Sequence, residues 1–309
     1  MMEQEYILSF FTPALDESTL ADRIGCAVQG FAAASEWARP EEKNSVDFPK
    51  KLRGIVVTGS LEEAERRLNL PDCPQNVLAG IVFFGNCGGE NAFMDFLCKK
   101  FPGVPFAGGS PAIGEDGTTM RILPQRAQVC LLLITDRRYR YCAHTLNVYD
   151  EQVAGVRVLG DDPRAIVQVE CNGAVLPLRE LLLREAKQRN ITSGLTERFS
   201  IADAAGRNIH LIPEGDHFAC GADLPADGQV FIRHAENAAV LRKMRDFYAA
   251  EDALIFGCAG VKTLIGEEKL TTGRGSVGLF MFGEVVSMNR TSDFANLMLT
   301  RLSVLPKTE

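Results

Sequence analysis

The chain has 309 residues, of which 46% are hydrophobic and 24% are charged. This balance is that of a globular protein with a full core, and the length exceeds what one hydrophobic core usually organises. The formal net charge of -7 at pH 7 argues against a protein that binds nucleic-acid phosphates, because such proteins need clustered Lys and Arg. We therefore expect two joined halves and no nucleic-acid partner.

Three further features of the sequence indicate in which cellular compartment the protein is located. The first residues, Met1–Glu5, are acidic where a secretion signal would be basic. No apolar run approaches the roughly 18 residues that are needed to cross a bilayer. The nine cysteines are odd in number and scattered, so we interpret most of them as buried thiols and not as disulfides. These features predict a cytoplasmic protein with no membrane partner.

The first hundred residues alternate between strand and helix patterns. Apolar runs predict strands at Tyr6–Phe11, at Gly54–Thr58, at Val77–Phe84 and from Val104. Helical spacing predicts helices at about Leu20–Phe31, Leu61–Leu70 and Asn91–Phe101, and the charges and prolines of Ala38–Lys51 predict an exposed loop. This alternation favours crossover connections and partly parallel strand pairing.

In the middle of the chain, the alternation of strands and helices gives way to consecutive strand patterns. Met120–Leu123, Val129–Thr135 and Tyr139–Val148 follow one another with short turns, which predicts antiparallel strands with a hairpin tip at Asp136-Arg137. Such a hairpin could place Cys130 opposite Cys142. The polar, glycine-containing stretch that follows, 150–162, predicts a boundary, so we divide the chain into domains 1–150 and 151–309.

The second half begins with a strong turn signal, Asn172-Gly173, between two short strands. Pro177 then starts a helix, and a second helix is predicted at Glu236–Tyr248. Further strands are predicted at 208–212, 218–219, 229–232, 253–256, 277–282 and 297–305. The fold class that we predict is α/β, with mixed β-sheets flanked by helices and two related halves packed as one compact unit.

Apolar runs that end in glycine recur in both halves. The run from Val104 ends at Gly108-Gly109-Ser110, with Glu115 just beyond, and the run from Ala253 ends at Gly257-Cys258-Ala259-Gly260. The run from Val277 ends at Gly283-Glu284. If these ends converge in a cleft, the carboxylates of Glu115 and Glu284 could bind a cationic group, and burial would raise their pKa values.

The same residues resemble a known family. Phe256–Gly260, Gly278–Val285 and Asn296–Leu305 are similar to the C-terminal half of the FIST family, named for F-box and intracellular signal transduction, and Val104–Glu115 is similar to its N-terminal half. The resemblance implies a sensory module that binds small molecules such as amino acids. Val261-Lys262 replaces an arginine that members often carry, and Ala295-Asn296-Leu297-Met298 stands where members have a more polar sequence.

We expect a small-molecule-binding sensor of a cytoplasmic signalling pathway, whose output is made by a partner protein in trans. The resemblance implies a ligand site at the glycine-ended strands, and Val261–Gly275 is the predicted mobile element. The expected ligand-binding residues are Gly108, Gly109, Ser110, Glu115, Cys258, Gly260, Gly283, Glu284 and Asn296.

Alternatives remain open at this stage. A cysteine- or carboxylate-dependent hydrolase would need a base near Cys258 or Cys87, for which His234 is a candidate. A scaffold without a ligand is favoured by the apolar residues Ala295, Leu297 and Met298. Gly85–Gly89 fits neither nucleotide-binding motif, and His217 with Cys220 forms only half of a zinc site. We expect no metal and no catalytic residue; haem, described for some FIST-like sensors, would use one of the four histidines as a ligand.

Overall fold

The computed structural model describes residues 3–11, 27–33, 45–85, 88–110, 127–265, 270–281, 283–288 and 291–307. Its fold is mixed α/β, with 21% of the residues in helices and 44% in strands, which confirms the predicted fold class. The predicted strand Met120–Leu123, together with Cys87 and Glu115, lies outside the described residues.

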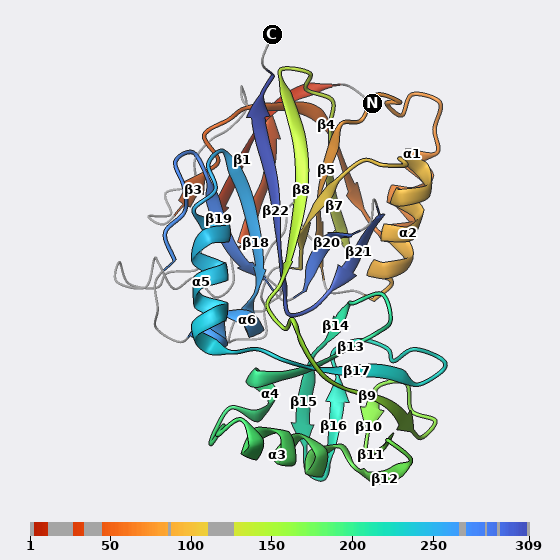
Figure 1. The fold of residues 1–309 in the computed structure, drawn as a ribbon. Helices are drawn as coiled ribbons and strands as arrows, with labels where there is room; N and C mark the ends of the chain where they lie inside the picture. Colours follow the sequence, from red (N-terminus) through yellow and green to blue (C-terminus); the bar gives the residue numbers. More distant parts are fainter. Residues whose placement is uncertain are drawn as a thin grey trace.

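The largest sheet combines strands from both ends of the sequence (Figure 1). Its strand order is β2-β1-β4-β7-β5-β6-β20-β21, with β3 paired to β1. β5 and β6 are parallel, as the alternation of strands and helices predicts, and the other pairs are antiparallel. The strands are β1 (Gln4–Phe11), β2 (Ala27–Ala33), β3 (Ser45–Asp47), β4 (Leu52–Gly59), β5 (Ala79–Phe84), β6 (Phe106–Gly109), β7 (Val129–Ile134), β20 (Glu284–Met288) and β21 (Thr291–Ala295).

A second sheet packs face to face against the first. Its order is β19 (Val277–Met281), β18 (Ala253–Cys258), β22 (Met298–Pro306) and β8 (Tyr139–Asn147). The inner faces of the two sheets share one apolar cluster, in which the rings of Phe83 and Phe256 meet edge to face with centroids 5.9 Å apart. β18 and β22 are the central strands of this sheet, and β19, from the third apolar run near the end of the chain, lies at its edge.

Helices cover the outer faces of both sheets (Figure 1). α1 (Leu61–Leu68) and α2 (Glu90–Lys100) pack on the outer face of the large sheet, and α5 (Asn237–Tyr248) and α6 (Ala259–Ile265) pack on that of the smaller sheet. α1 begins with a capping box, because the Ser60 hydroxyl accepts from the Glu63 N–H and the Glu63 carboxylate accepts from the Ser60 N–H. The four layers are therefore helix, sheet, sheet and helix. Among the helices that the structure describes, none combines the length and apolarity needed to cross a bilayer.

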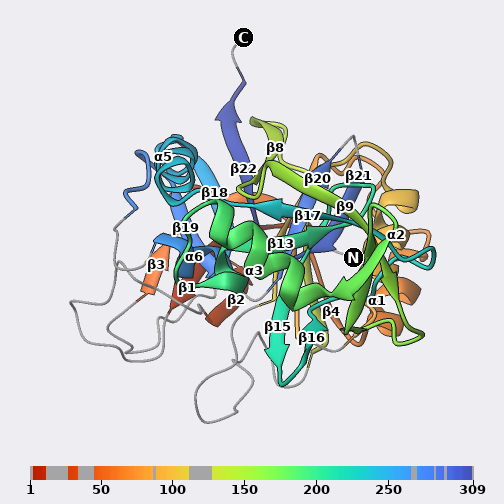
Figure 2. The ribbon, with the colours of Figure 1, turned by 60° about the horizontal axis from the view of Figure 1, so that its bottom comes forward.

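Residues 151–234 form a unit with its own core, and Figure 2 brings this end of the molecule forward. Its two sheets have the orders β12-β11-β9-β17-β13-β14 and β10-β16-β15. The chain leaves the four-layered body after β8 and returns to it at α5, so we call residues 151–234 the inserted unit. Its elements are β9 (Glu151–Leu159), β10 (Ala165–Ile166), β11 (Gln168–Cys171), β12 (Ala174–Pro177), α3 (Leu178–Gln188), α4 (Leu195–Arg198), β13 (Phe199–Ala202), β14 (Asn208–Ile209), β15 (Leu211–Glu214), β16 (His217–Cys220) and β17 (Gln229–His234).

The hairpin prediction for Asn172-Gly173 is confirmed. Cys171 pairs with Ala174, and the two turn residues have φ angles of 52° and 79°, as a two-residue turn of this kind requires. The division into domains 1–150 and 151–309 stays a prediction. β20 and β21 nevertheless pair with β6, and β8 pairs with β22, so the sheets themselves extend across residue 150.

Two predictions for the beginning of the chain are wrong where the structure describes it. Ala27–Ala33, the end of the predicted helix Leu20–Phe31, is strand β2 and pairs along β1. The predicted exposed loop Ala38–Lys51 contains β3, and the side chain of Phe48 is buried. In both places, pairing with a strand distant in sequence overrides the local pattern.

The predicted hairpin at Asp136-Arg137 is also wrong. β7 lies between β4 and β5 in the large sheet, whereas β8 pairs with β22 in the other sheet. The chain crosses between the sheets at Asp136, whose carboxylate accepts from the Arg53 backbone N–H at 3.1 Å and from Arg138 Nε at 2.9 Å. Cys130 is consequently buried in the core, while Cys142 is exposed, and neither forms a disulfide.

Candidate functional site

Glycine-ended strands from both halves of the sequence meet at the junction of β6 and β20. Gly109 pairs with Glu284 and Gly108 pairs with Val285 in an antiparallel register. Beyond the strand, the Ser110 backbone N–H donates to the Gly283 carbonyl oxygen at 3.0 Å. The structure therefore brings together two predicted ligand-binding segments, one from each half of the sequence.

Gly108 has a local reason to be glycine. Its φ angle is +132°, and a Cβ atom at this position would lie 1.9 Å from the carbonyl oxygen of Val82 on β5. Side chains rarely adopt this backbone conformation, and no side chain fits at this distance. The glycine lets β6 lie against β5 on one side while it pairs with β20 on the other.

Glu284 is the first residue of β20 and its side chain is completely buried. The Cys258 side chain and the Met298 backbone act to lower the carboxyl pKa, yet neither carboxylate oxygen completes a hydrogen bond. Desolvation outweighs these contacts and raises the pKa of Glu284 well above its ordinary value of 4.5. Glu284 begins a strand, whereas the sequence pattern placed it at the end of one.

Cys258 ends β18 and is buried beside Glu284. Burial, and then the Glu284 charge, raise the pKa of its thiol above the ordinary value, although contacts with the backbone of Leu297 and Gly260 oppose the shift. The thiol is consequently neutral at physiological pH, which is unfavourable for a nucleophile. The candidate base His234 bonds through Nδ1 to Glu151 Oε2 at 2.8 Å.

The remaining predicted site residues lie around this pair. Ser110 is buried and its hydroxyl oxygen has no hydrogen-bond partner. Gly260, in α6, approaches the turn between β21 and β22 so closely that a Cβ atom on it would lie 2.6 Å from Leu297 Cδ2. Gly283 forms the turn before β20 with φ of +94°. Asn296 is half-buried in the β21–β22 turn, on the side that faces the inserted unit.

Contacts that the sequence did not single out link the inserted unit to the four-layered body near the β21–β22 turn. Asn208 Nδ2 donates to the Leu297 carbonyl oxygen at 3.2 Å and to Asn147 Oδ1 at 2.8 Å. Tyr149 is buried near Cys258, and its hydroxyl donates to the Glu197 carbonyl oxygen at 2.9 Å. No sequence motif marks these residues, because they become neighbours only through packing between the inserted unit and the four-layered body.

His210 adds another polar group at this junction. A Cβ atom on Gly221 would lie 3.2 Å from His210 Cβ and 3.7 Å from Asn296 Nδ2, so His210 and Asn296 flank the same backbone. Burial lowers the pKa of His210, and its Nδ1 atom has no hydrogen-bond partner. The imidazole is therefore neutral at physiological pH and retains an unused polar atom. Its position was not predicted.

The mobile element predicted at Val261–Gly275 is partly wrong. Residues 259–265 form α6, whose Val261 and Leu264 side chains are buried in the apolar cluster beneath α5. Val261, where family members often carry arginine, is thus a core residue. Of the remainder of this segment, 266–269 lies outside the described residues.

The partial zinc motif does not assemble. His217 and Cys220 are three residues apart on β16, so their side chains point to opposite faces of the strand. The His217 ring nitrogens instead lie 3.5 Å from the Glu214 carboxylate and 3.6 Å from the Asp216 carboxylate. Within the described part of the chain, no group of three or more His, Cys, Asp or Glu side chains is placed to hold a metal ion. Haem ligation by a histidine stays a prediction.

Comparisons with protein-family models, with curated proteins and with solved structures found no match for this chain. The likeness to the FIST family therefore rests on the motifs quoted above and stays a prediction. The fold brings several polar side chains together around Glu284, and these indicate a function.

Proposed function

We propose that this protein is a cytoplasmic sensor that reversibly binds a small molecule with an amino or other cationic group beside Glu284. The observation that supports this is a completely buried carboxyl group whose oxygens complete no hydrogen bond, and whose only polar neighbours among the described residues that act on its pKa are the Cys258 thiol and the backbone of Glu284 and Met298. Buried polar groups in proteins are nearly always paired, and each exception calls for a physical explanation. A cationic ligand would supply the missing donors.

The neighbouring groups support a polar ligand. The Ser110 hydroxyl and His210 Nδ1 are also buried without partners. Leaving such a group unpaired costs about 1 to 3 kcal/mol, so a ligand that paired several of them would gain affinity from contacts that the free protein lacks. The FIST resemblance, which implies ligands such as amino acids, agrees with an amino group as the partner of Glu284.

A sensor also needs two states that differ in affinity for the ligand. Because Glu284 and Ser110 are buried, a ligand reaches them only when the covering segments separate. The contacts of Asn208 and Tyr149 link the inserted unit to the strand ends, so a change in this packing would move residues 151–234 relative to the four-layered body. We propose that a partner protein reads this change in trans.

The alternatives have less support. A hydrolase that uses Cys258 would have to ionise a thiol whose pKa is raised by burial and by Glu284. A scaffold would present apolar surface, whereas the side chains of Ala295, Leu297 and Met298 are all buried. These three residues contribute to the core and offer no exposed face.

The proposal predicts ligand-induced stabilisation that depends on Glu284. In thermal-shift screening against amino acids and simple amines, a ligand at 100 times its dissociation constant should add about 2.7 kcal/mol. Glu284→Gln keeps the shape but cannot become an anion, and it should abolish this stabilisation. Glu251→Gln is the matched control, because Glu251 is an exposed carboxylate on the surface.

The same ligand should bind more tightly as the pH rises. Free Glu284 holds a proton because its pKa is raised, and a cation favours the ionised form, so binding releases that proton. While the pH is below the folded-state pKa of Glu284, the affinity for the ligand should therefore increase by up to about tenfold per pH unit. Calorimetry at several pH values measures this increase. A ligand with equal affinity for wild type and Glu284→Gln would exclude Glu284 from the site.

A further inference from the structure

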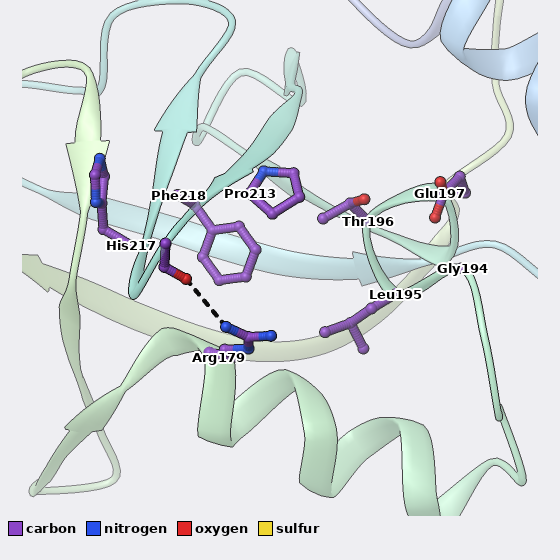
Figure 3. Close-up of a pocket in the computed structure, with 9 residues that line it drawn as sticks. Arg179, Gly194, Leu195, Thr196, Glu197, Pro213, His217 and Phe218 are labelled. Atoms are coloured by element: carbon purple, nitrogen blue, oxygen red, sulfur yellow. Dashed lines mark hydrogen bonds between the residues drawn. The ribbon is translucent and has the colours of Figure 1, made fainter.

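A cavity lies entirely within the inserted unit, between α3, α4 and the β15–β16 hairpin (Figure 3). It has a volume of about 260 Å³. Leu195, Pro213 and Phe218 provide apolar walls, and Arg179 lies on the side formed by α3. None of these residues belongs to the site around Glu284, so the cavity calls for its own explanation.

Arg179 is an exposed cation whose guanidinium makes one hydrogen bond with the backbone. Its Nη1 atom donates to the Gly215 carbonyl oxygen at 3.0 Å, which holds the guanidinium beside the Phe218 ring. Among the described residues, no carboxylate lies within ion-pair distance of Arg179. The other arginine of α3, Arg184, pairs with Glu180 on the same helix. A guanidinium has five N–H donors in a planar fork, so Arg179 retains donors that suit a carboxylate.

The other charged side chains that line the cavity do not pair with Arg179, so this end of the cavity still favours a carboxylate. His217 is already flanked by the carboxylates of Glu214 and Asp216. Glu197 lines the opposite end of the cavity, and no ion pair among the described residues joins it to Arg179. The free positive charge therefore lies at one end of a cavity whose middle is apolar.

We propose that this cavity binds a small monocarboxylate with an apolar body. The carboxylate pairs with Arg179, and the body lies between Leu195, Pro213 and Phe218. The volume sets the size of the ligand, since a cavity of about 150 Å³ holds benzene and drug-sized ligands occupy roughly 300 Å³ or more. An aromatic or short aliphatic acid of about ten non-hydrogen atoms fits between these limits.

Phenylacetate is a suitable probe, and its neutral analogue phenylacetamide has the same shape. Titration calorimetry or ligand-observed NMR should show that phenylacetate binds the full chain at least about tenfold more tightly than phenylacetamide, because a hydrogen bond between charged groups is worth more than a neutral one. Arg179→Gln should lower the affinity for phenylacetate to that of phenylacetamide. Arg184→Gln, on the same helix, should leave it unchanged.

The outcome is decisive because Arg179 is exposed, so its replacement should not impair folding, which circular dichroism checks. Equal affinities for the two probes, unchanged binding by Arg179→Gln, or no binding of phenylacetate would each overturn the proposal. Glu284→Gln should bind phenylacetate as wild type does, which separates this cavity from the site of the proposed sensor function.

Discussion

Replacing Glu284 by glutamine should make the ligand-free protein more stable at neutral pH. Burial raises the pKa of Glu284, so the folded protein retains a proton that the unfolded chain releases above about pH 4.5. The free energy of unfolding then falls as the pH rises, by about 1.4 kcal/mol per pH unit, until the pH reaches the folded-state pKa. Glutamine does not titrate, so the variant should lose this dependence.

Urea denaturation of both proteins at pH 4, 5, 6, 7 and 8 measures this effect. The difference in unfolding free energy should be small near pH 4 and should grow in favour of Glu284→Gln at higher pH. The contributions of the other titrating groups are the same in both proteins and cancel in this difference. Parallel stability profiles would show that Glu284 ionises as freely in the folded protein as in the unfolded chain. Glu251→Gln should follow the wild-type profile.

Replacing Gly108 by alanine should destabilise the protein by about 4 kcal/mol or more. The change combines an unfavourable backbone conformation at φ of +132° with a Cβ atom 1.9 Å from the Val82 carbonyl oxygen. β6 would have to move away from β5, and this movement would disturb the pairing of Gly109 with Glu284. Urea denaturation measures the loss of stability, and the ligand-induced thermal shift should be lost as well.

Gly160→Ala is the matched control for this prediction. Gly160 has the same φ of +132°, but apart from its chain neighbours no atom of the described residues lies within 4 Å of the position that a Cβ would take. The control variant should therefore lose only the conformational part, about 1 to 3 kcal/mol. Equal losses in the two variants would mean that β6 adjusts to the added methyl group and that its close approach to β5 is not required.

Much of the fold could be predicted from local patterns. Hydrophobic periodicity located most of the strands after residue 50, and Leu178, Leu181, Leu182 and Ala186 are buried on one face of α3 as their spacing predicts. These predictions succeed because periodicity reports directly on which side chains face a core. They fail at β2 and at the Asp136 crossing, where pairing between distant strands decides the structure.

The candidate site also has some features that the sequence predicts and others that only the structure reveals. By itself, the sequence determined that the apolar runs before Gly108 and Gly283 end in glycine and that Glu284 follows the second of them. Only the tertiary structure decided that Glu284 is buried against Cys258, that Asn208 from a distant segment binds the Leu297 carbonyl in the neighbouring turn, and that Tyr149 binds the Glu197 carbonyl. The physical reason is that burial and desolvation depend on every element packed around a group, whereas a sequence motif reports only on its immediate neighbours in the chain.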